Sequence, residues 1–444
     1  MRPSQTTRRA VVKTLGAAPL LLGSGAFAAA DERKDGPTRK DRVHVGVIGV
    51  GARGTSLLET MLVLGNVTVP ALADIHAGRL EAAATLVDKA SGSRPALYGD
   101  GPEAFRELVA RRDLDAVIIA TPWEWHTPMA VAAMKSGKFA GVEVPAALTV
   151  DECWELVRTS EATGVWCMML ENVCYFREMM QVLNMVRAGQ FGELLNCAGG
   201  YNHDARASTF DSAGNFDASH WYTWHALKRD GNLYPTHPVG PIAQCLNIDR
   251  GDRFEYLVSV SSKARGLNKW VRDHHGAEHP NATRRFALGD VNTTIIRSAS
   301  GATVTLTYDV QSARPYDLAI RIQGTEGLYE MPRDAVYLEG RSAPDQWQPL
   351  GDYRGEYEHP LWRTMGAKAG DFGHSGSDYI MLHRFMECVA TRFIPEQDVY
   401  DAATWSSILP LSEKSVAMRG ALVEFPDFTG GRWRNRTPVP IIGG

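Results

Sequence analysis

The chain has 444 residues, of which 44% are hydrophobic and 22% charged, a composition that excludes a wholly disordered protein. At about 150 residues per domain, this length predicts two or three domains. The net charge is −4, from 47 Lys and Arg against 51 Asp and Glu, so we expect no nucleic-acid partner.

The first 30 residues differ from the rest of the chain. A basic start with Arg8 and Arg9 precedes an apolar run over 15–28 and a small-residue end. This order is typical of a signal peptide, and the arginine pair resembles a twin-arginine signal. We therefore expect a signal peptide over 1–30, a charged linker over 31–41, and a protein exported by the twin-arginine route to the periplasm or secreted. A basic tail before a cytosolic domain is the alternative.

No membrane anchor is expected from this leader. Its apolar run is too short and too rich in glycine to span a bilayer comfortably, and no cysteine follows it. An exported protein can form disulfides. However, the twin-arginine route exports proteins that have folded in a reducing compartment, so we favour free, buried thiols for the six cysteines: Cys153, Cys167, Cys174, Cys197, Cys245 and Cys388.

A glycine motif follows the first apolar strand, which begins at Val43. Gly49, Gly51 and Gly54 have the spacing of a dinucleotide-binding turn, in which the glycines permit a tight turn, a close backbone approach to a pyrophosphate, and close packing of helix on strand. Asp74 ends the next strand, about 20 residues further on, where a carboxylate can bind both ribose hydroxyls and repel a 2′-phosphate. We therefore predict NAD as the cofactor; the alternative is a structural glycine turn with an incidental aspartate.

Strands and helices alternate through the first part of the chain, which predicts a doubly wound parallel sheet over residues 42–175. The carboxyl ends of its strands should carry the ligand site. The expected strands are 67–73, 96–98, 115–120, 139–143 and 165–170, and the expected helices are 55–64, 77–90, 102–111, 128–136 and 150–163.

The second part, residues 176–433, is predicted to be an α+β domain with a largely antiparallel sheet, followed by a tail over 434–444. Two late helices should return to the first domain. One face of the sheet can pack against the nucleotide domain or against another subunit in a homo-oligomer, and the sequence leaves both open. The expected strands are 194–200, 254–261, 293–298, 302–308 and 318–323, and the late helices are 378–390 and 402–417.

Several strings resemble the glucose–fructose oxidoreductase and inositol dehydrogenase family. Thr121-Pro-Trp-Glu-Trp-His126 and Val142-Glu-Val-Pro145 occupy positions of that family's motifs. The resemblance implies a Rossmann domain joined to a domain with a mostly antiparallel sheet. Members carry Glu-Lys-Pro after the fifth strand, with a lysine that assists oxidation of a sugar or polyol. Val144 replaces this lysine, which argues against simple alcohol oxidation.

Further strings are more specific. Leu170-Glu-Asn-Val-Cys-Tyr175, Leu233-Tyr-Pro-Thr-His237 and Arg314-Pro-Tyr316 look like the NAD-dependent α-N-acetylgalactosaminidases of glycoside hydrolase family 109. The resemblance runs from about residue 43 to 433. It implies a glycoside substrate and a recycled NAD: the sugar is transiently oxidised at C3, C2 is deprotonated, the aglycone is eliminated from C1, water adds, and C3 is reduced again.

The resemblance also implies the site residues. With the glycine motif, the cofactor residues would be Gly49, Gly51, Ala52, Arg53, Gly54, Asp74, Trp123, Glu124, Trp125, His126, Glu143, Val144 and Asn172. Those that bind substrate would be Tyr201, Tyr222, Tyr234, Pro235, Thr236, His237 and Tyr316. Tyr222 stands where the family usually has arginine, and a phenol cannot replace a guanidinium without changing charge and reach, so the exact sugar specificity stays open.

His237 is the leading acid/base candidate, since histidine can exchange protons near neutral pH. A histidine that only bonds to the backbone at a helix start is the alternative. Tyr234 could assist the proton transfer, although its ordinary pKa of about 10 makes it a poor base. His203 and His225 are lesser candidates in polar loops. His274, His275 and His279 lack a convincing ligand framework, so we expect no metal.

Two other functions stay open from the sequence alone. An ordinary NAD-dependent sugar or polyol oxidoreductase fits the fold but is opposed by Val144. A sensor without catalytic activity also fits the scaffold, because fold does not determine function. Turnover without an added electron acceptor distinguishes the glycosidase from both.

Overall fold

The computed structural model describes residues 40–216, 223–370 and 372–443. The predicted signal peptide, most of the predicted linker and Tyr222 lie outside the described residues. Within those three ranges, no helix combines the length and the apolar character that a bilayer crossing needs.

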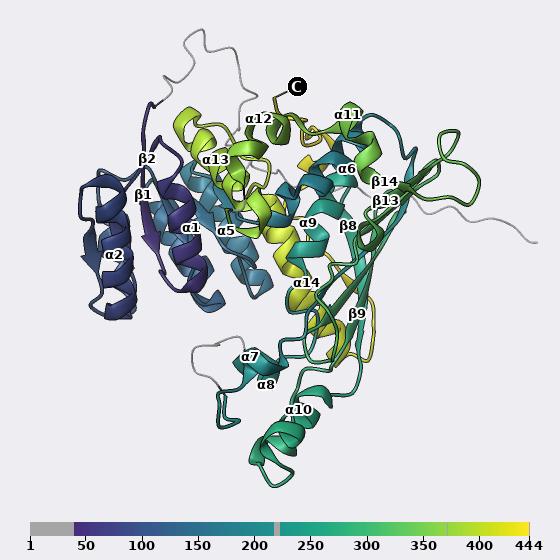
Figure 1. The fold of residues 1–444 in the computed structure, drawn as a ribbon, viewed down its shortest axis with the longest axis horizontal. Coiled ribbons are helices and arrows are strands. Elements are labelled where there is room, and N and C mark those ends of the chain that lie inside the picture. The colour runs from purple at the N-terminus through teal and green to yellow at the C-terminus, as the bar shows by residue number, and fades with distance from the viewer. Residues whose placement is uncertain (1–39, 217–222, 371, 444) are drawn as a thin grey trace, which may run out of the picture. The chain divides into compact units, whose positions relative to one another are not determined.

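The first layer is a parallel sheet, as predicted (Figure 1). In the described chain its strand order is β3-β2-β1-β4-β5-β6, so the direction of winding reverses beside β1. Such a reversal opens a crevice at the carboxyl ends of the strands, where nucleotides bind. The strands are β1 (Val43–Ile48), β2 (Val67–Ala73), β3 (Ala96–Tyr98), β4 (Ala116–Ile119), β5 (Phe139–Val142) and β6 (Cys167–Met169).

Helices connect these strands and cover the sheet, so that all four side chains of β4 are buried. The last of them, α5, has a reciprocal capping box, in which Thr149 accepts from the Glu152 amide and Glu152 accepts from the Thr149 amide. Gly164 ends it in the left-handed conformation. The helices are α1 (Ala52–Leu62), α2 (Ala77–Ser91), α3 (Phe105–Ala110), α4 (His126–Lys135) and α5 (Val150–Thr163).

The second layer is a mixed, largely antiparallel sheet, which confirms the predicted fold class. Its order in the described residues is β14-β13-β12-β11-β7-β10-β9-β8-β15, and only the β7–β10 pair in this order is parallel. The strands are β7 (Leu194–Asn202), β8 (Phe254–Ser261), β9 (Asn292–Ser298), β10 (Thr303–Asp309), β11 (Arg321–Gly324), β12 (Gly327–Glu330), β13 (Ala335–Leu338), β14 (Gln348–Pro349) and β15 (Val423–Glu424).

The strand predicted over 318–323 is shorter in the structure. β11 begins only at Arg321, because Ala319 has a φ of 47° and so interrupts the extended backbone. Asp317 instead pairs with Asn202 as an isolated bridge at the end of β7. This break leaves Tyr316 in a loop beside the end of β7, and its ring contacts that of Tyr201 on the strand.

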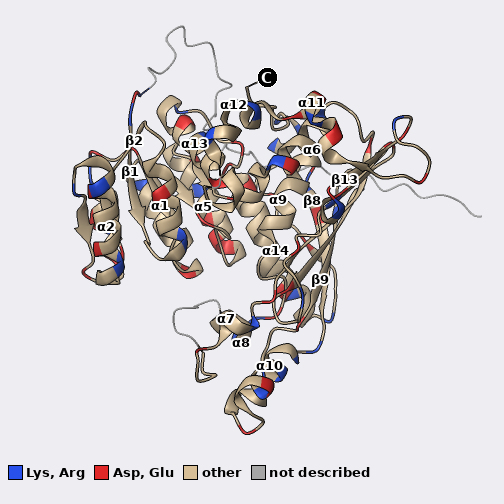
Figure 2. Cartoon of the chain, in the orientation of Figure 1, with Lys and Arg blue, Asp and Glu red and all other residues tan. Residues whose placement is uncertain are grey.

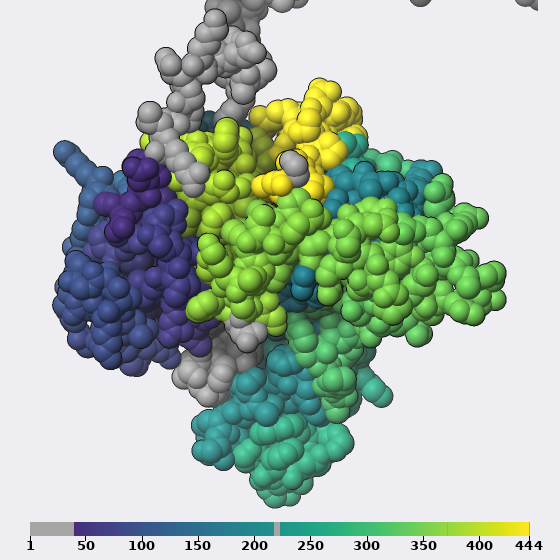
Figure 3. Space-filling view, turned by 45° about the horizontal axis from the view of Figure 1, so that its top comes forward, coloured from purple at the N-terminus to yellow at the C-terminus, as the bar shows by residue number. Residues whose placement is uncertain are grey.

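Helices of the second part join the two layers. α13 packs against α1, and α14 packs against both α5 and β8. In Figure 3 the yellow-green residues around α13 lie directly against the purple residues of the first strand–helix unit. The helices are α6 (Arg177–Arg187), α7 (Arg206–Thr209), α8 (Thr223–Lys228), α9 (Thr236–Cys245), α10 (Gly266–His275), α11 (Arg354–Tyr357), α12 (Pro360–Ala369), α13 (Ser377–Thr391) and α14 (Val399–Ala417).

Charged residues are mixed along the exposed helices. Figure 2 shows Lys and Arg interspersed with Asp and Glu on α2, α10 and α13, and the face drawn there has no continuous basic band. The six cysteines are all free and buried, as favoured from the sequence.

Candidate active site

The turn between β1 and α1 is shaped by its glycines. Gly49 has a φ of 86°, and a Cβ there would lie 2.5 Å from the Ala120 carbonyl oxygen. A Cβ at Gly54 would lie only 1.9 Å from the Gly49 oxygen. The turn therefore excludes side chains at both positions and brings the N-terminus of α1 to the crevice, where unpaired N–H groups can bind a pyrophosphate.

A cavity of about 520 Å³ lies beside this turn. It runs from the end of β2 past β4 and β5 to Tyr234, which belongs to the second part of the chain. Its size and position suit a dinucleotide. The lining includes these predicted cofactor residues: Gly49, Gly51, Ala52, Arg53, Asp74, Trp123, Trp125, His126, Glu143 and Val144.

Asp74 is fixed on the cavity wall by backbone donors. Its Oδ2 accepts from the Val50 amide and its Oδ1 accepts from the His76 amide, both at 2.8 Å. A carboxylate can accept about four hydrogen bonds, so the oriented group retains capacity for ribose hydroxyls. Its negative charge also disfavours a 2′-phosphate, in agreement with the choice of NAD.

Arg53 links two carboxylates at the inner end of the cavity. Its Nε donates to Glu143 Oε1 at 2.7 Å, and its Nη1 and Nη2 donate to the two oxygens of Asp378 at 2.5 and 3.0 Å. Asn172 Nδ2 donates to Asp378 Oδ1 at 3.0 Å, and His374 lies 2.9 Å from Oδ2. Arg53 and Asn172 therefore share a partner that the sequence did not single out.

Asp378 is fully buried at the start of α13. Burial by itself raises the pKa of this carboxyl, but hydrogen bonds from His374 and Arg53 outweigh it and hold the pKa well below the usual range. Asp378 is therefore ionised at neutral pH. We call this group of Arg53, Glu143, Asn172, His374 and Asp378 the arginine cluster.

A second buried carboxylate, Glu171, contacts the predicted acid/base. Its Oε1 lies 2.7 Å from His237 Nδ1, and the Glu171 side chain is completely buried while that of His237 is 13% exposed. Glu171 follows β6, and His237 lies in the first turn of α9. The alternative for His237 is a histidine that bonds only to the backbone at a helix start. The contact with the Glu171 side chain differs from this alternative.

Aromatic rings surround His237 on the side away from β6. The Tyr234 ring lies 4.9 Å from the His237 ring and stacks on Trp123 at 5.5 Å, measured between ring centroids. Tyr201 lies 4.7 Å from Tyr234 and 5.5 Å from His237, and Tyr316 lies 6.2 Å from Tyr201. Such rings present both apolar faces and hydroxyls, which suits a sugar.

The phenol of Tyr234 is neutral at ordinary pH. Burial, followed by the neighbouring Tyr201, raises its pKa well above the usual value. Tyr234 can therefore donate a hydrogen bond to a sugar oxygen, but it is a poor base. His237, whose ring lies against both Tyr201 and Tyr234, stays the candidate acid/base, whereas His203 contacts Tyr201 and Tyr316.

A second cavity of about 310 Å³ adjoins the first. Trp123 and Tyr234 line both, so the two rings form their common wall. Tyr201, His203, His225 and Tyr308 contribute to the second cavity, together with aliphatic side chains from α8, from α10 and from the loops, including Val310 just after β10. A pocket with apolar walls and a few polar groups, next to a nucleotide crevice, suits a small sugar moiety.

Other predicted residues lie around these cavities. Glu124 is largely exposed, with its Oε1 3.4 Å from His225 Nε2, and Asn172 reaches the site through Asp378. Pro235 and Thr236 begin α9 next to His237. Tyr222 falls outside the described residues. His274 and His275 contact the Trp270 ring, and the described ranges contain no cluster of three or more His, Cys, Asp or Glu arranged to hold a metal ion.

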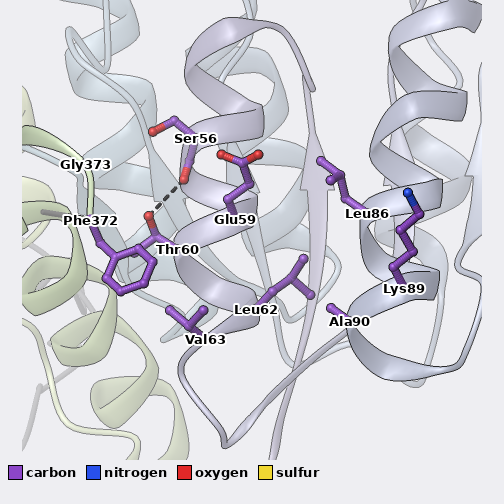
Figure 4. A pocket seen from close by; sticks show the side chains of 10 residues that line it. All are labelled: Ser56, Glu59, Thr60, Leu62, Val63, Leu86, Lys89, Ala90, Phe372 and Gly373. Atoms are coloured by element: carbon purple, nitrogen blue, oxygen red, sulfur yellow. Dashed lines mark hydrogen bonds between the residues drawn. The ribbon is translucent and has the colours of Figure 1, made fainter. Parts of the chain in front are cut away.

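A separate hollow of about 550 Å³ lies on the outer face of the first domain. Figure 4 shows Glu59 of α1 and Val63, the residue after this helix, on one side, Leu86 and Lys89 of α2 on the other, and Phe372 at its edge. It does not share a lining residue with the nucleotide cavity. The chemistry is therefore assigned to the paired cavities rather than to this surface hollow.

Two family models match the chain. One, described as the C-terminal domain of glycosyl hydrolase 109, matches residues 175–435, and the other, an oxidoreductase family with an NAD-binding Rossmann fold, matches residues 43–171. The chain belongs to the glycosyl hydrolase 109 family. This confirms the predicted family, the predicted class of enzyme, a glycosidase, and the predicted NAD cofactor.

Relatives in the glycosyl hydrolase 109 family match nearly the whole chain. A Tannerella forsythia protein named alpha-N-acetylgalactosaminidase is 41% identical over 98% of this chain and 99% of its own length. A family 109 protein of Solibacter usitatus is 43% identical, over 98% of this chain and all of its own length.

Solved structures show the same fold at lower identity. Levoglucosan dehydrogenase in complex with NADH and levoglucosan is 20% identical, with a TM-score of 0.67, covering 87% of this chain and 100% of that one. An inositol dehydrogenase homologue from Azotobacter vinelandii is 18% identical, with a TM-score of 0.63, covering 88% and 99%. At these identities the likeness establishes the arrangement of two domains.

Proposed function

We propose that this family 109 protein removes terminal α-N-acetylgalactosamine residues from glycosides and recycles its NAD+ in each turnover. The observation that carries the proposal is the position of His237. It is bonded to a buried carboxylate and lies beside Tyr234, whose ring lines both the nucleotide cavity and the second cavity. The named activity of the Tannerella forsythia relative supports the choice of sugar.

The nucleotide site fits NAD. The glycine turn leaves no room for side chains where the backbone must approach a pyrophosphate, and Asp74 is oriented at the end of β2. Gly49, Gly51, Arg53 and Asp74 would hold the cofactor. When bound, NAD+ supplies the reversible oxidation of the C3 hydroxyl of the sugar to a ketone.

His237 then acts as the acid/base. A ketone at C3 acidifies the hydrogen on C2, so a neutral imidazole can accept this proton. The electron pair of the broken C–H bond forms the C1–C2 double bond as the glycosidic oxygen leaves C1. Water then adds its hydroxyl at C1 and supplies the proton that the released aglycone carries, and His237 gives a proton back to C2. Tyr201 and Tyr234 orient the sugar through their faces and hydroxyls.

Val144 distinguishes this site from that of an alcohol dehydrogenase. The position follows Glu143 at the end of β5, where Val144 lies 3% exposed on the wall of the nucleotide cavity. A valine has no proton to exchange with a C3 hydroxyl. An ordinary NAD-dependent sugar oxidoreductase, the alternative function, therefore lacks its expected lysine here.

The test is an assay without an added electron acceptor. Purified protein incubated with a chromogenic α-N-acetylgalactosaminide should release the aglycone without net accumulation of NADH. Net NADH from free sugars, with no aglycone released, would contradict the glycosidase and support the oxidoreductase. A matched β-anomer and the α-galactoside without the acetamido group define the specificity that Tyr222 leaves open.

Export belongs to the same proposal. The twin-arginine leader over residues 1–30 supports a protein that folds around NAD in the cytoplasm and then works in the periplasm or outside the cell, where free nucleotide is scarce. Protein purified from the exported fraction should carry bound NAD. An Arg8→Lys, Arg9→Lys double variant should remain in the cytoplasm, and export unchanged by this variant would contradict the route.

Assembly into a homo-oligomer stays a prediction. Val260 on β8 and Ile295 on β9 are 57% and 46% exposed on the second sheet, so apolar surface is available to another copy of the chain. Light scattering of the purified protein measures the state directly, and a monomer at micromolar concentration would contradict the prediction.

A further inference from the structure

Hydrogen bonds fix both the backbone and the side chain of Glu171, and only its Oε2 lacks one among the described residues. Its backbone N–H donates to Gln397 Oε1 at 3.0 Å, and Gln397 Nε2 donates back to the Glu171 carbonyl at 2.9 Å. Its Oε1 also accepts from the Val173 amide at 3.0 Å. Gln397 is itself completely buried, so the glutamate has little freedom to move.

Close packing of α9 brings His237 to this carboxylate. Gly240 lies one turn further along α9, and a Cβ at this position would lie 3.0 Å from Glu171 Cγ and 2.8 Å from Cys174 Sγ. The helix therefore approaches the segment after β6 more closely than any other residue at position 240 would allow. Residues three apart share a helix face, so the same approach places His237 against Glu171.

The two carboxylate oxygens of Glu171 differ in their hydrogen bonding. Oε1 has both the imidazole and a backbone amide, whereas Oε2 is buried without a hydrogen-bond partner among the described residues. Leaving a polar oxygen unpaired in the interior is unfavourable, and more so for a charged group than for a neutral one. Glu358 also has a buried unpaired oxygen, so the contact with His237 is what distinguishes Glu171.

We propose that Glu171 is a positioning residue for proton transfer, which acts through His237 and does not touch the sugar. The proposal rests on the proposed function. The 2.7 Å contact keeps the imidazole proton on Nδ1, so the lone pair of Nε2 is available to the sugar. The same buried carboxylate stabilises the imidazolium that forms when Nε2 accepts a proton.

The dyad removes and returns the proton of C2, while water supplies both the hydroxyl at C1 and the proton on the released aglycone. The C2–H bond of the oxidised sugar breaks, its proton moves to His237 Nε2, and its electron pair stays with the carbon skeleton. Nδ1 keeps its own proton throughout, in the contact with Glu171 Oε1. Nε2 exchanges this proton with water while the unsaturated sugar is bound, since the His237 side chain is 13% exposed. On the return step Nε2 gives a solvent-derived proton to C2, and the dyad ends in the state in which it began.

The first test is Glu171→Gln, which preserves size and can still accept a hydrogen bond but removes the charge. We expect kcat to fall by roughly 10²–10⁴-fold with KM changed less than about threefold, since substrate contacts stay in place. Glu358→Gln is the matched control. Glu358 is also a buried carboxylate with one unpaired oxygen, but its partner is Arg177 at the start of α6 rather than His237, so this variant should keep wild-type kcat.

The second readout separates positioning from simple loss of folded enzyme. With a glycoside deuterated at C2, Glu171→Gln should show a larger primary isotope effect on kcat than the wild type, because proton transfer becomes slower than the other steps. A structural defect lowers the amount of active enzyme and leaves the isotope effect unchanged. An unchanged isotope effect, or kcat within about threefold of wild type, would overturn the proposal.

The third readout does not depend on turnover. In the full-length holoenzyme, the His237 Nδ1 proton bonded to a carboxylate should give a downfield proton resonance that persists in Glu358→Gln and disappears from this region in Glu171→Gln. Presence of the resonance with no aglycone release by the wild type would contradict the proposed function alone. Aglycone release by a wild type that lacks the resonance would contradict the role of Glu171 alone.

Discussion

Two completely buried carboxylates support residues of the site, and their partners differ: Asp378 bonds to Arg53 on the wall of the nucleotide cavity, and Glu171 contacts His237. Asp378 has a guanidinium, an amide and an imidazole around it, so both of its oxygens are bonded. Glu171 has an imidazole and one backbone amide, and one of its oxygens is unpaired. The first arrangement favours a permanent charge pair, and the second leaves the carboxylate able to stabilise a charge that appears only during turnover.

The comparison shows that burial alone does not assign a role. Both groups are 0% exposed, and the chemistry of the partner makes the difference. An arginine is always charged, so its pair with Asp378 is structural at any working pH. A histidine changes charge near neutrality, so its pair with Glu171 can take part in proton transfer.

The largest loss of activity is expected from substitution of His237, the partner of Glu171. His237→Gln keeps an amide that can donate to Glu171 but cannot exchange protons, so glycosidase kcat should fall by roughly 10³-fold or more. Bound NAD and the melting temperature should stay near wild type, which absorbance and thermal unfolding measure. Retention of full activity would remove His237 from the mechanism.

Substitution of Asp378 should lower the stability of the protein and its retention of NAD. Asp378→Asn leaves Arg53 with Glu143 as its remaining carboxylate partner, and loss of one side of a buried ion pair costs about 3 kcal/mol of unfolding free energy. Because Arg53 and Asn172 lose their shared anchor, NAD should be lost during gel filtration. At saturating NAD+, kcat should fall much less than in His237→Gln. An equal loss of kcat in both variants would contradict the assignment of a structural role to Asp378 and a catalytic role to His237.

A third carboxylate, Asp74, is partly exposed and serves as a reference for the buried pair. Asp74→Ala removes the acceptor for ribose hydroxyls, so affinity for NAD+ should fall about tenfold, and discrimination against NADP+ should weaken. Titration of the protein freed of nucleotide measures both constants. Unchanged selectivity would show that another group at the end of β2 selects the cofactor.

The smallest effect concerns Asp249, a buried carboxylate outside the site. Burial, and then the nearby Asp401, raises the pKa of Asp249 to about 7, above the unfolded value of about 3.9. The folded state therefore binds a proton that the unfolded state releases between these values, and stability falls as pH rises through this window, by at most about 1.4 kcal/mol per pH unit.

Asp249→Asn should remove this pH dependence. Asp249 has a φ of 62°, which asparagine also adopts readily, so the variant should fold. Urea unfolding at pH 5 and pH 7 should show a smaller difference in the variant than in the wild type. Equal differences in the two proteins would contradict the raised pKa.

Much of the fold could be predicted because its signals are local. The alternation of apolar strands and amphipathic helices, with the turn at Gly49, specifies the first sheet within consecutive residues. In the second part, β14 and β15 have only two residues each, which is too short for a periodic pattern. Ala319 interrupts β11 through its backbone angle, which residue type does not reveal.

For the site as well, local sequence signals identify some residues but not their tertiary partners. Motif strings single out Arg53, Glu143 and His237, but the groups that hold them come from elsewhere in the chain. Asp378 lies 325 residues from Arg53, and Glu171 lies 66 residues from His237. Glu171 has one usable signal, its place directly after a buried strand. Asp378 has none beyond its position at the start of a late helix, because tertiary packing alone brings α13 to α1.

The most direct test of the central claim is turnover in deuterium oxide. Hydrolysis of an unlabelled α-N-acetylgalactosaminide by the NAD-loaded protein should release a sugar with deuterium at C2 and leave the amount of NADH unchanged, both measured on the same reaction by mass spectrometry and absorbance. Aglycone release with only hydrogen at C2 would contradict deprotonation by His237 and the recycling of NAD+ on which the account depends.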